Sequence, residues 1–258
     1  MPSKAKKKRP GKKATAPTKR ITSVTEYIRH LEEHCDADDL LFRGQREDLP
    51  LIPRIARLKL SGDLLSAEQA MLRDFKFQAL PLLTLQPQSD WDWLAVAQHH
   101  GMATRLLDWT ANPIAALWFA VEHPATNGPG VVWIFDTEDT DYATPDGGED
   151  PFAGDWTRVF RPRHITRRII AQSGWFTVHK WVGVPKGGFI PLERNWKYKP
   201  RLAKLHIPPE AFARIRRELD RWGFNAATLY SDLDGLCRHV EWQRSLLADE
   251  IDARTNSA

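Results

Sequence analysis

Residues 97–120 read AQHHGMATRLLDWTANPIAALWFA, so two histidines, an arginine and an aspartate come just before an almost wholly apolar run. Asn112 is a typical helix N-cap, and Pro113 suits the first position of a helix, so a helix is predicted to begin here. Residues 114–121 are apolar on every side of that helix, which is typical of a helix buried all round. The polar residues before it are therefore expected to lie against the core.

Charged side chains in such a position need partners, because removing an isolated charge from water costs several kcal/mol. Arg105 and Asp108 are subject to this penalty beside the predicted buried helix. Arg43, in the middle of the apolar segment 41–45, is subject to it too. We therefore predict that Arg43 or Arg105 pairs with Asp108 in a partly buried cleft.

Helix and strand signals alternate along the rest of the chain. Capping-box patterns at residues 23–26 and 66–69 predict two helix starts, and Gly101 is a typical residue after a helix end. We expect strands at 40–43, 130–135, 175–179 and 202–207, a short extended segment at 104–107, and helices at 23–34, 66–80, 92–100, 208–223 and 232–242. This mixture predicts a single α+β domain with mixed helices and sheet over residues 21–258.

Composition indicates a folded protein outside the membrane. The 258 residues are 42% hydrophobic and include 11 Trp and 11 Phe, enough for a sizeable core. The longest apolar run, residues 114–121, is far shorter than the ~20 residues that a membrane helix needs, and the N-terminus lacks a secretory signal. We expect a cytoplasmic protein without a membrane partner. Cys35 and Cys237 lack the spacing of a metal site or a disulfide framework.

The basic charge is concentrated at the N-terminus. Residues 1–20, MPSKAKKKRPGKKATAPTKR, hold nine Lys or Arg, three Pro and no acid, and in the rest of the chain the acids outnumber Lys and Arg. We expect this tail to be disordered, because it has too little apolar surface to fold. It either attaches the protein to a nucleic acid or another polyanion, or it serves only to keep the chain soluble.

Five blocks of sequence, in order, carry a resemblance to a known family. They are residues 41–45 (LFRGQ), 51–54 (LIPR), 98–101 with 104–110 (QHHG and TRLLDWT), 168–177 (RIIAQSGWFT) and 231–236 (SDLDGL). Together they resemble the FRG domain family, which is named for its Phe-Arg-Gly motif, over roughly residues 24–243. Met102-Ala103 stands where the family often has an apolar residue and a proline. The resemblance implies a domain and the place of a site, but no established reaction.

A second, weaker similarity is to the ADP-ribosyltransferases. Their order of an Arg or His on a first strand, a hydroxyl residue before a helix and a later acid is matched by Arg43, by Thr110 before the 115–120 helix, and by Asp234 or Glu241. The similarity implies that Arg43 holds a dinucleotide and that the acid stabilises the positive charge that develops on the ribose. It therefore implies an enzyme that uses NAD, such as a toxin or a defence effector.

The candidate site and the candidate functions follow from these patterns. The candidate catalytic residues are Arg43, His99, His100, Asp108, Thr110 and Asp234, and the candidate substrate contacts are Gln45, Gln98, Thr104 and Arg105. One alternative is a non-catalytic module that senses a ligand or partner and is tethered by the basic tail. Another is a nucleic-acid hydrolase, in which His99 or His100 is the general base and Asp108 or Asp232 orients it or holds a metal. No resident cofactor or metal is predicted, and NAD is the candidate substrate.

Overall fold

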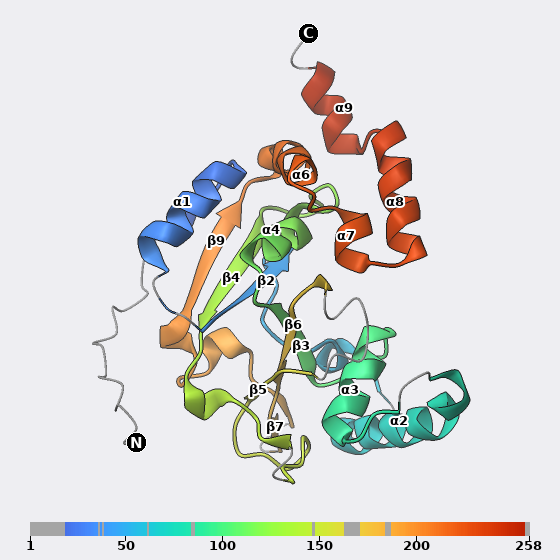
Figure 1. Cartoon of the computed structure of the whole chain (residues 1–258). Coiled ribbons are helices and arrows are strands. Elements are labelled where there is room, and N and C mark those ends of the chain that lie inside the picture. Colours follow the sequence, from blue (N-terminus) through green and yellow to red (C-terminus); the bar gives the residue numbers. More distant parts are fainter. Residues whose placement is uncertain are drawn as a thin grey trace, which may run out of the picture.

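The structure is a computed structural model, which describes residues 19–255 except 36, 38, 61, 84–85, 146–147, 163–170 and 184–186, and only the backbone of 252–255. The described helices pack on a mixed and mostly antiparallel sheet, which confirms the α+β class (Figure 1). The elements are β1 (Lys19–Arg20), α1 (Val24–His34), β2 (Leu40–Gln45), α2 (Leu64–Ala79), α3 (Asp90–His99), β3 (Leu106–Thr110), α4 (Pro113–Val121), β4 (Gly130–Asp136), β5 (Arg158–Phe160), β6 (Gly174–Val178), β7 (Trp181–Val182), β8 (Gly188–Phe189), β9 (Leu202–Ile207), α6 (Phe212–Arg221), α7 (Ala226–Tyr230), α8 (Leu233–Arg244) and α9 (Ala248–Thr255).

The main sheet is built of two halves that share one residue pair. In the described residues it has seven strands in the order β1-β9-β4-β2-β3-β6-β5, and only β1 and β9 run parallel. β2 pairs with β4 along its whole length, and β3 pairs with β6 along its whole length. Between β2 and β3 the ladder consists of the single pair Phe42 and Thr110. The sheet therefore splits beyond this pair.

Helices cover one face of each half. Alternation along β2 directs Phe42 into a core with α1, α4 and α6, and directs Leu41 into a core on the opposite face. Alternation along β3 directs Leu106 to the same side as Phe42, where it packs against α2 and α3. The two groups of helices therefore cover neighbouring parts of one face, as Figure 1 shows. Side chains of the segment that contains Leu192 and Tyr198 pack into the core on the opposite face.

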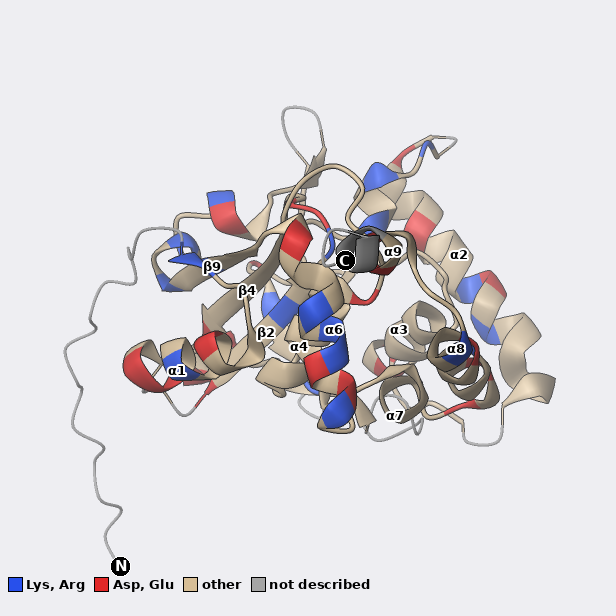
Figure 2. Cartoon of the chain, turned by 90° about the horizontal axis from the view of Figure 1, so that it is seen from above, with Lys and Arg blue, Asp and Glu red and all other residues tan. Residues whose placement is uncertain are grey.

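Helix α4 packs directly on the backbone of β2. A Cβ atom added at Gly44 would lie 1.9 Å from the carbonyl oxygen of Ala116, a distance that no side chain can occupy. The predicted cap is confirmed, because the Asn112 side chain accepts hydrogen bonds from the amides of Ile114 and Ala115 at 2.9 and 3.2 Å. Most of α4 is buried, and Figure 2 shows it free of charged residues, whereas α6 carries both signs.

The first predicted helix start is confirmed and the second needs correction. Ser23 caps α1 and accepts the Glu26 amide at 3.2 Å. The pattern at residues 66–69 is not a capping box, because α2 begins earlier and Asp63 is its cap, accepting the Ser66 amide at 2.9 Å. Glu68, in the middle of that pattern, is buried and pairs with Arg105 in the core.

The extended segment expected at residues 104–107 lies further along the chain as β3. Its pairing with β6 continues to Thr110, because Trp109 and Thr110 find backbone partners in Trp175 and Gly174. The strand predicted at 202–207 is β9, and the central strand predicted at 130–135 is β4.

The N-terminal strand shortens the predicted tail. Lys19 and Arg20 form β1 and pair with Leu205 and His206 of β9, so the last two residues of the predicted disordered segment belong to the sheet. Residues 1–18 lie outside the described residues, and their disorder stays a prediction. In the described part of the chain, no helix has the length and apolar character that crossing a lipid bilayer requires.

The contact between Gly44 and α4 makes Gly44→Ala a test of the fold. We expect the variant to lose about 3 kcal/mol of unfolding free energy, the upper end for overpacking, because a clash with backbone atoms cannot be relieved by rotating a side chain. Urea unfolding measures this loss. The control is Gly188→Ala, since an added Cβ at Gly188 has no neighbour within 4 Å. Equal stability of Gly44→Ala and the wild type would contradict the close packing.

Candidate functional site

A cleft of about 690 Å³ opens where the two halves of the sheet part. Its walls come from the split ends of β2 and β3, the end of α4, and the segment after β2. Five of the ten candidate residues line it, namely Arg43, Gln45, Gln98, Asp108 and Thr110. The structure therefore brings residues from three separate parts of the sequence into one concave site.

Arg43 bridges the split in the sheet. Its Nη1 donates to the carbonyl oxygen of Asp108 at 2.7 Å, and the same nitrogen lies 3.6 Å from Oδ2 of that residue. The side chain is 20% exposed, and neither Nε nor Nη2 has an acceptor among the described residues. Burial lowers the pKa of the Arg43 guanidinium, and the Asp108 carboxylate opposes this effect. The guanidinium thus joins β2 and β3 where backbone hydrogen bonds do not. Its Nε and Nη2 groups keep N–H donors that no described residue accepts.

A short chain of hydrogen bonds orients the Asp108 carboxylate. The buried hydroxyl of Thr104 donates to Oε1 of Gln98 at 2.9 Å, and Nε2 of Gln98 donates to Oδ2 of Asp108 at 3.2 Å. The Asp108 side chain is 57% exposed, so it stays open to the cleft. Thr104 does not line the cleft, and its link to the cleft is the hydrogen bond to Gln98.

Arg105 does not pair with Asp108. Its guanidinium donates to Oε2 of Glu68 at 2.7 and 3.0 Å and to the carbonyl of Pro151 at 3.0 Å, and both charged side chains are about 1% exposed. The face of the guanidinium also lies 4.3 Å from the centre of the Phe152 ring. Of the two partners predicted for Asp108, the structure selects Arg43. Arg105 lies in the core and does not reach the cleft.

The two histidines lie beside the cleft and not in it. His99 lines a small cavity of about 80 Å³ that shares Gln98 and Asp108 with the main cleft. His100 is exposed just after α3. Its ring meets that of His99 edge to face, with the ring centres 4.8 Å apart. Of the pair, only His99 is next to the site that Arg43 and Asp108 form.

Thr110 and Gln45 line the cleft, and their side-chain oxygens already have partners in the fold. The Thr110 hydroxyl donates to the Gln172 carbonyl at 2.5 Å and accepts the Asn112 amide at 2.9 Å. The Gln45 side chain accepts from the indole of Trp133 at 3.0 Å. Both side chains therefore help to hold the strand ends in place around Arg43.

The C-terminal acids lie on or beside α8, away from Arg43. Asp232 caps the helix and accepts the Gly235 amide at 2.7 Å, and Asp234 is exposed in the first turn. Glu241 lines a different cavity. None of the three lines the cleft. The residues that match the ADP-ribosyltransferases in sequence order therefore do not all meet in one site, because the acid is missing from the cleft that Arg43 and Thr110 line.

The cleft also contains polar residues that the sequence patterns did not indicate, namely Arg46, Glu47, Arg57, Glu122, His123, Gln172 and Tyr230. Oε2 of Glu122 accepts a hydrogen bond from the Tyr230 hydroxyl at 2.9 Å, and burial raises the pKa of Glu122. Glu122 and His123 directly follow the apolar helix α4. A polar pair at the end of a buried helix is the feature of the sequence that could have indicated these two residues as part of the site.

A family comparison matches the part of the chain that provides most of the cleft lining, all but Gln172 and Tyr230. The geometry defines an α+β protein with a ligand-sized cleft at a split in its sheet. Residues 38–128 match the family model of the FRG domain, so the chain carries an FRG domain. The match contains Arg43, Gln98 and Asp108, but not the later blocks at 168–177 and 231–236, and residues 168–170 also lie outside the described residues. Searches of curated proteins and of solved structures found no match.

The buried pair of Arg105 and Glu68 predicts a large effect of Glu68→Gln. The amide keeps the shape but leaves the guanidinium without its counter-charge, so we expect a loss of about 3–5 kcal/mol in unfolding free energy. The control is Asp74→Asn, an exposed acid on the same helix, which should stay within about 0.5 kcal/mol of the wild type. A loss no larger than that of the control would refute the structural role of the pair.

His179 lies near Arg43 and is buried, and burial, followed by the charge of Arg43, lowers its pKa to about 3. It is therefore neutral in the folded protein, whereas in the unfolded chain it titrates near its ordinary value of about 6.5. Its contribution to stability is full above that value and is lost as the pH falls. Between pH 7 and pH 5 the loss amounts to about 2 kcal/mol.

The variant His179→Gln cannot titrate at this position. Between pH 7 and pH 5 its unfolding free energy should therefore fall by about 2 kcal/mol less than that of the wild type. Urea unfolding at both pH values measures the effect. His100→Gln, which changes an exposed histidine, is the control and should keep the pH dependence of the wild type. Identical pH dependence in His179→Gln and the wild type would show that His179 is not held neutral.

Proposed function

We propose that the cleft binds NAD and that the protein is an ADP-ribosyltransferase-like enzyme. The observation that supports this is the Arg43 guanidinium. It lines the cleft, its Nη2 has no acceptor among the described residues, and it lies beside the exposed Asp108 carboxylate. A guanidinium can donate two parallel hydrogen bonds to phosphate oxygens, which suits a pyrophosphate. Asp108 then lies where it can face the ribose attached to that pyrophosphate.

The other walls of the cleft suit the same ligand. Arg46 and Arg57 add positive charge close to Arg43. The rings of Phe119 and Tyr230 meet edge to face with centres 6.4 Å apart, which provides an aromatic wall for a base or a nicotinamide ring. The cavity volume of about 690 Å³ lies within the range of known small-molecule and cofactor pockets.

The proposed reaction breaks the bond between the ribose C1′ atom and the nicotinamide nitrogen. Nicotinamide leaves with the bonding electron pair as a neutral molecule, and the ribose becomes positively charged in the transition state. The Asp108 carboxylate, held by Gln98, stabilises that charge. An acceptor nucleophile, or water, forms the new bond at C1′ and gives up a proton.

Arg43→Lys tests the proposal while it keeps the positive charge. Lysine loses the fork geometry, so we expect NAD affinity to fall roughly tenfold to a hundredfold, the effect of losing a charge-assisted hydrogen bond. Calorimetric titration with NAD measures binding, and chromatography of released nicotinamide measures turnover. The control is Arg221→Lys at the exposed end of α6, which should match the wild type in both assays.

The outcomes separate the three candidate functions. Release of nicotinamide that Asp108→Asn abolishes supports the enzyme. Tight binding of NAD without release supports a ligand-sensing module, and cleavage of a labelled single-stranded oligonucleotide that His99→Ala abolishes supports a nucleic-acid hydrolase. If Arg43→Lys and the wild type bind NAD equally, or if neither binds it, the proposed dinucleotide site is wrong.

A further inference from the structure

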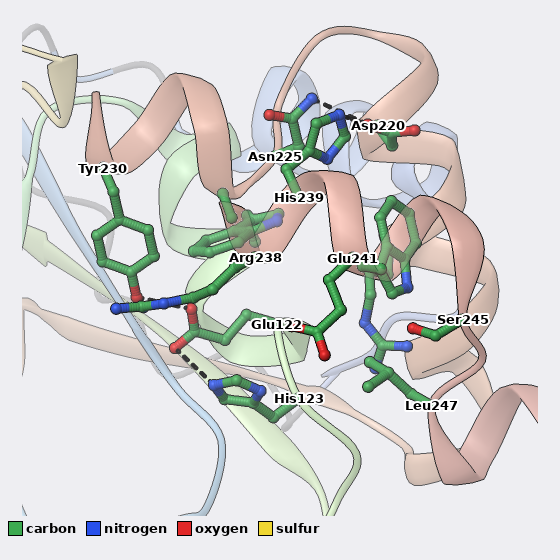
Figure 3. A pocket seen from close by; sticks show the side chains of 14 residues that line it. Glu122, His123, Asp220, Asn225, Tyr230, Arg238, His239, Glu241, Ser245 and Leu247 are labelled. Atoms are coloured by element: carbon green, nitrogen blue, oxygen red, sulfur yellow. Dashed lines mark hydrogen bonds and ion pairs between the residues drawn. The ribbon is translucent and has the colours of Figure 1, made fainter. Parts of the chain in front are cut away.

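A second cavity, of about 280 Å³, lies between the end of α4 and helices α6, α7 and α8 (Figure 3). Its aromatic lining comes from Trp118, Tyr230 and Trp242. The lining residues come from the end of α4 and from the consecutive helices α6 to α8, and most of them lie outside residues 38–128, which match the FRG domain. The cavity is thus formed largely by the part of the chain that the family model does not cover.

This cavity and the main cleft share a wall. Glu122, His123 and Tyr230 line both spaces, and the hydrogen bond between the Tyr230 hydroxyl and Glu122 lies in that wall. In Figure 3 the Glu122 carboxylate points toward Tyr230, and the Glu241 side chain extends from α8 into the cavity. Two carboxylates, one just after α4 and one on α8, therefore border the same space.

The positive charges around the cavity are fewer than they first appear, because Arg216 is fully engaged. It donates to the Val121 carbonyl at 2.9 Å, to Asp249 at 2.9 and 3.2 Å, and to Glu250 at 3.1 Å. Two carboxylates that do not line the cavity thus neutralise it. Of the residues that line the cavity, Arg238 is the other arginine, and it shares the space with two histidines and with the acids Glu122, Asp220 and Glu241.

The acids Asp220 and Glu241, which line the cavity, are less completely paired than Arg216. Asp220 accepts a hydrogen bond from Asn225 at 2.9 Å and lies 3.8 Å from His239. Glu241 has no hydrogen bond or ion pair with another described residue. A carboxylate without a partner, next to aromatic walls and a second carboxylate, is an environment that favours a cation.

The chain itself contains an example of this recognition. The Arg238 guanidinium lies over the Tyr230 ring, with its central carbon 4.9 Å from the ring centre. A planar cation is attracted to the face of an aromatic ring, and it gains more where a carboxylate is close. Trp118, Trp242 and Glu241 also line the cavity and provide the same two elements, aromatic rings and a carboxylate.

We propose that this cavity is a second binding site, separate from the main cleft, for an organic cation with a flat or apolar body, such as a guanidinium or amidinium compound. Glu241 supplies the counter-charge at the rim, and Glu122 supplies it at the wall shared with the cleft. The proposal does not depend on NAD as the ligand of the cleft, because the residues that carry it lie on the α8 side of that wall.

Benzamidine is the probe for this site, and its neutral and anionic analogues benzamide and benzoate are the controls of charge. Calorimetric titration of the full-length protein should show saturable benzamidine binding with a Kd of about 1 mM or tighter, an ordinary affinity for a ligand of that size. Benzamide should bind roughly tenfold more weakly, because it lacks the charge that pairs with the carboxylates.

Two matched variants on α8 locate the binding. Glu241→Gln should weaken benzamidine roughly tenfold, the effect of losing one charge-assisted contact. Asp234→Asn, which removes an exposed acid of the same helix outside the cavity, should leave the affinity unchanged. Arg43→Lys should also leave it unchanged, whatever that variant does to NAD binding.

Three results would overturn the proposal. These are no saturable binding of benzamidine, equal or tighter binding of benzamide or benzoate, or an affinity that changes with Arg43→Lys and not with Glu241→Gln. The last would place the probe in the main cleft. Failure of the NAD proposal is read separately from nicotinamide release and from the Arg43→Lys titration, so the two proposals can fail independently.

Discussion

The hydrogen bond from Arg43 to the carbonyl of Asp108 holds the two halves of the sheet together where they have already parted. β2 and β3 share one backbone pair, Phe42 with Thr110, and beyond it the arginine side chain spans the gap. A backbone ladder would have closed this gap and left no space for a ligand. The cleft and its main charge therefore have one origin, because the residue that bridges the split also lines the cavity.

The Phe-Arg-Gly motif contains three successive residues with three separate structural roles. Phe42 points into the core with α4, Arg43 fills the split, and Gly44 lets the backbone of α4 approach the strand. Alternation along a strand explains how neighbours can face a helix and its opposite side in turn. The range that matches the FRG domain contains both the motif and the Asp108 carbonyl that Arg43 contacts.

The arginines of this protein are distinguished by how completely they are paired. Arg105 and Arg216 have carboxylate partners that complete their hydrogen bonds, so they belong to the core. Arg43 makes a single hydrogen bond among the described residues and lines a cavity. An incompletely paired cation at a cavity can bind a ligand without first breaking a structural contact, and this is why the functional proposal rests on Arg43.

The sequence by itself determined the elements whose signals are local. The cap at Asn112, the apolar helix after it and the strand at 202–207 depend on neighbouring residues, and all three are present in the structure. It also indicated that the charges beside the core need partners, because that cost does not depend on the fold. Only the tertiary structure decided which partners they have. Glu68 reached Arg105 because α2 packs beside β3, and Glu122 met Tyr230 because α7 returns to the end of α4. Such contacts depend on register and packing between distant segments, which no local pattern encodes.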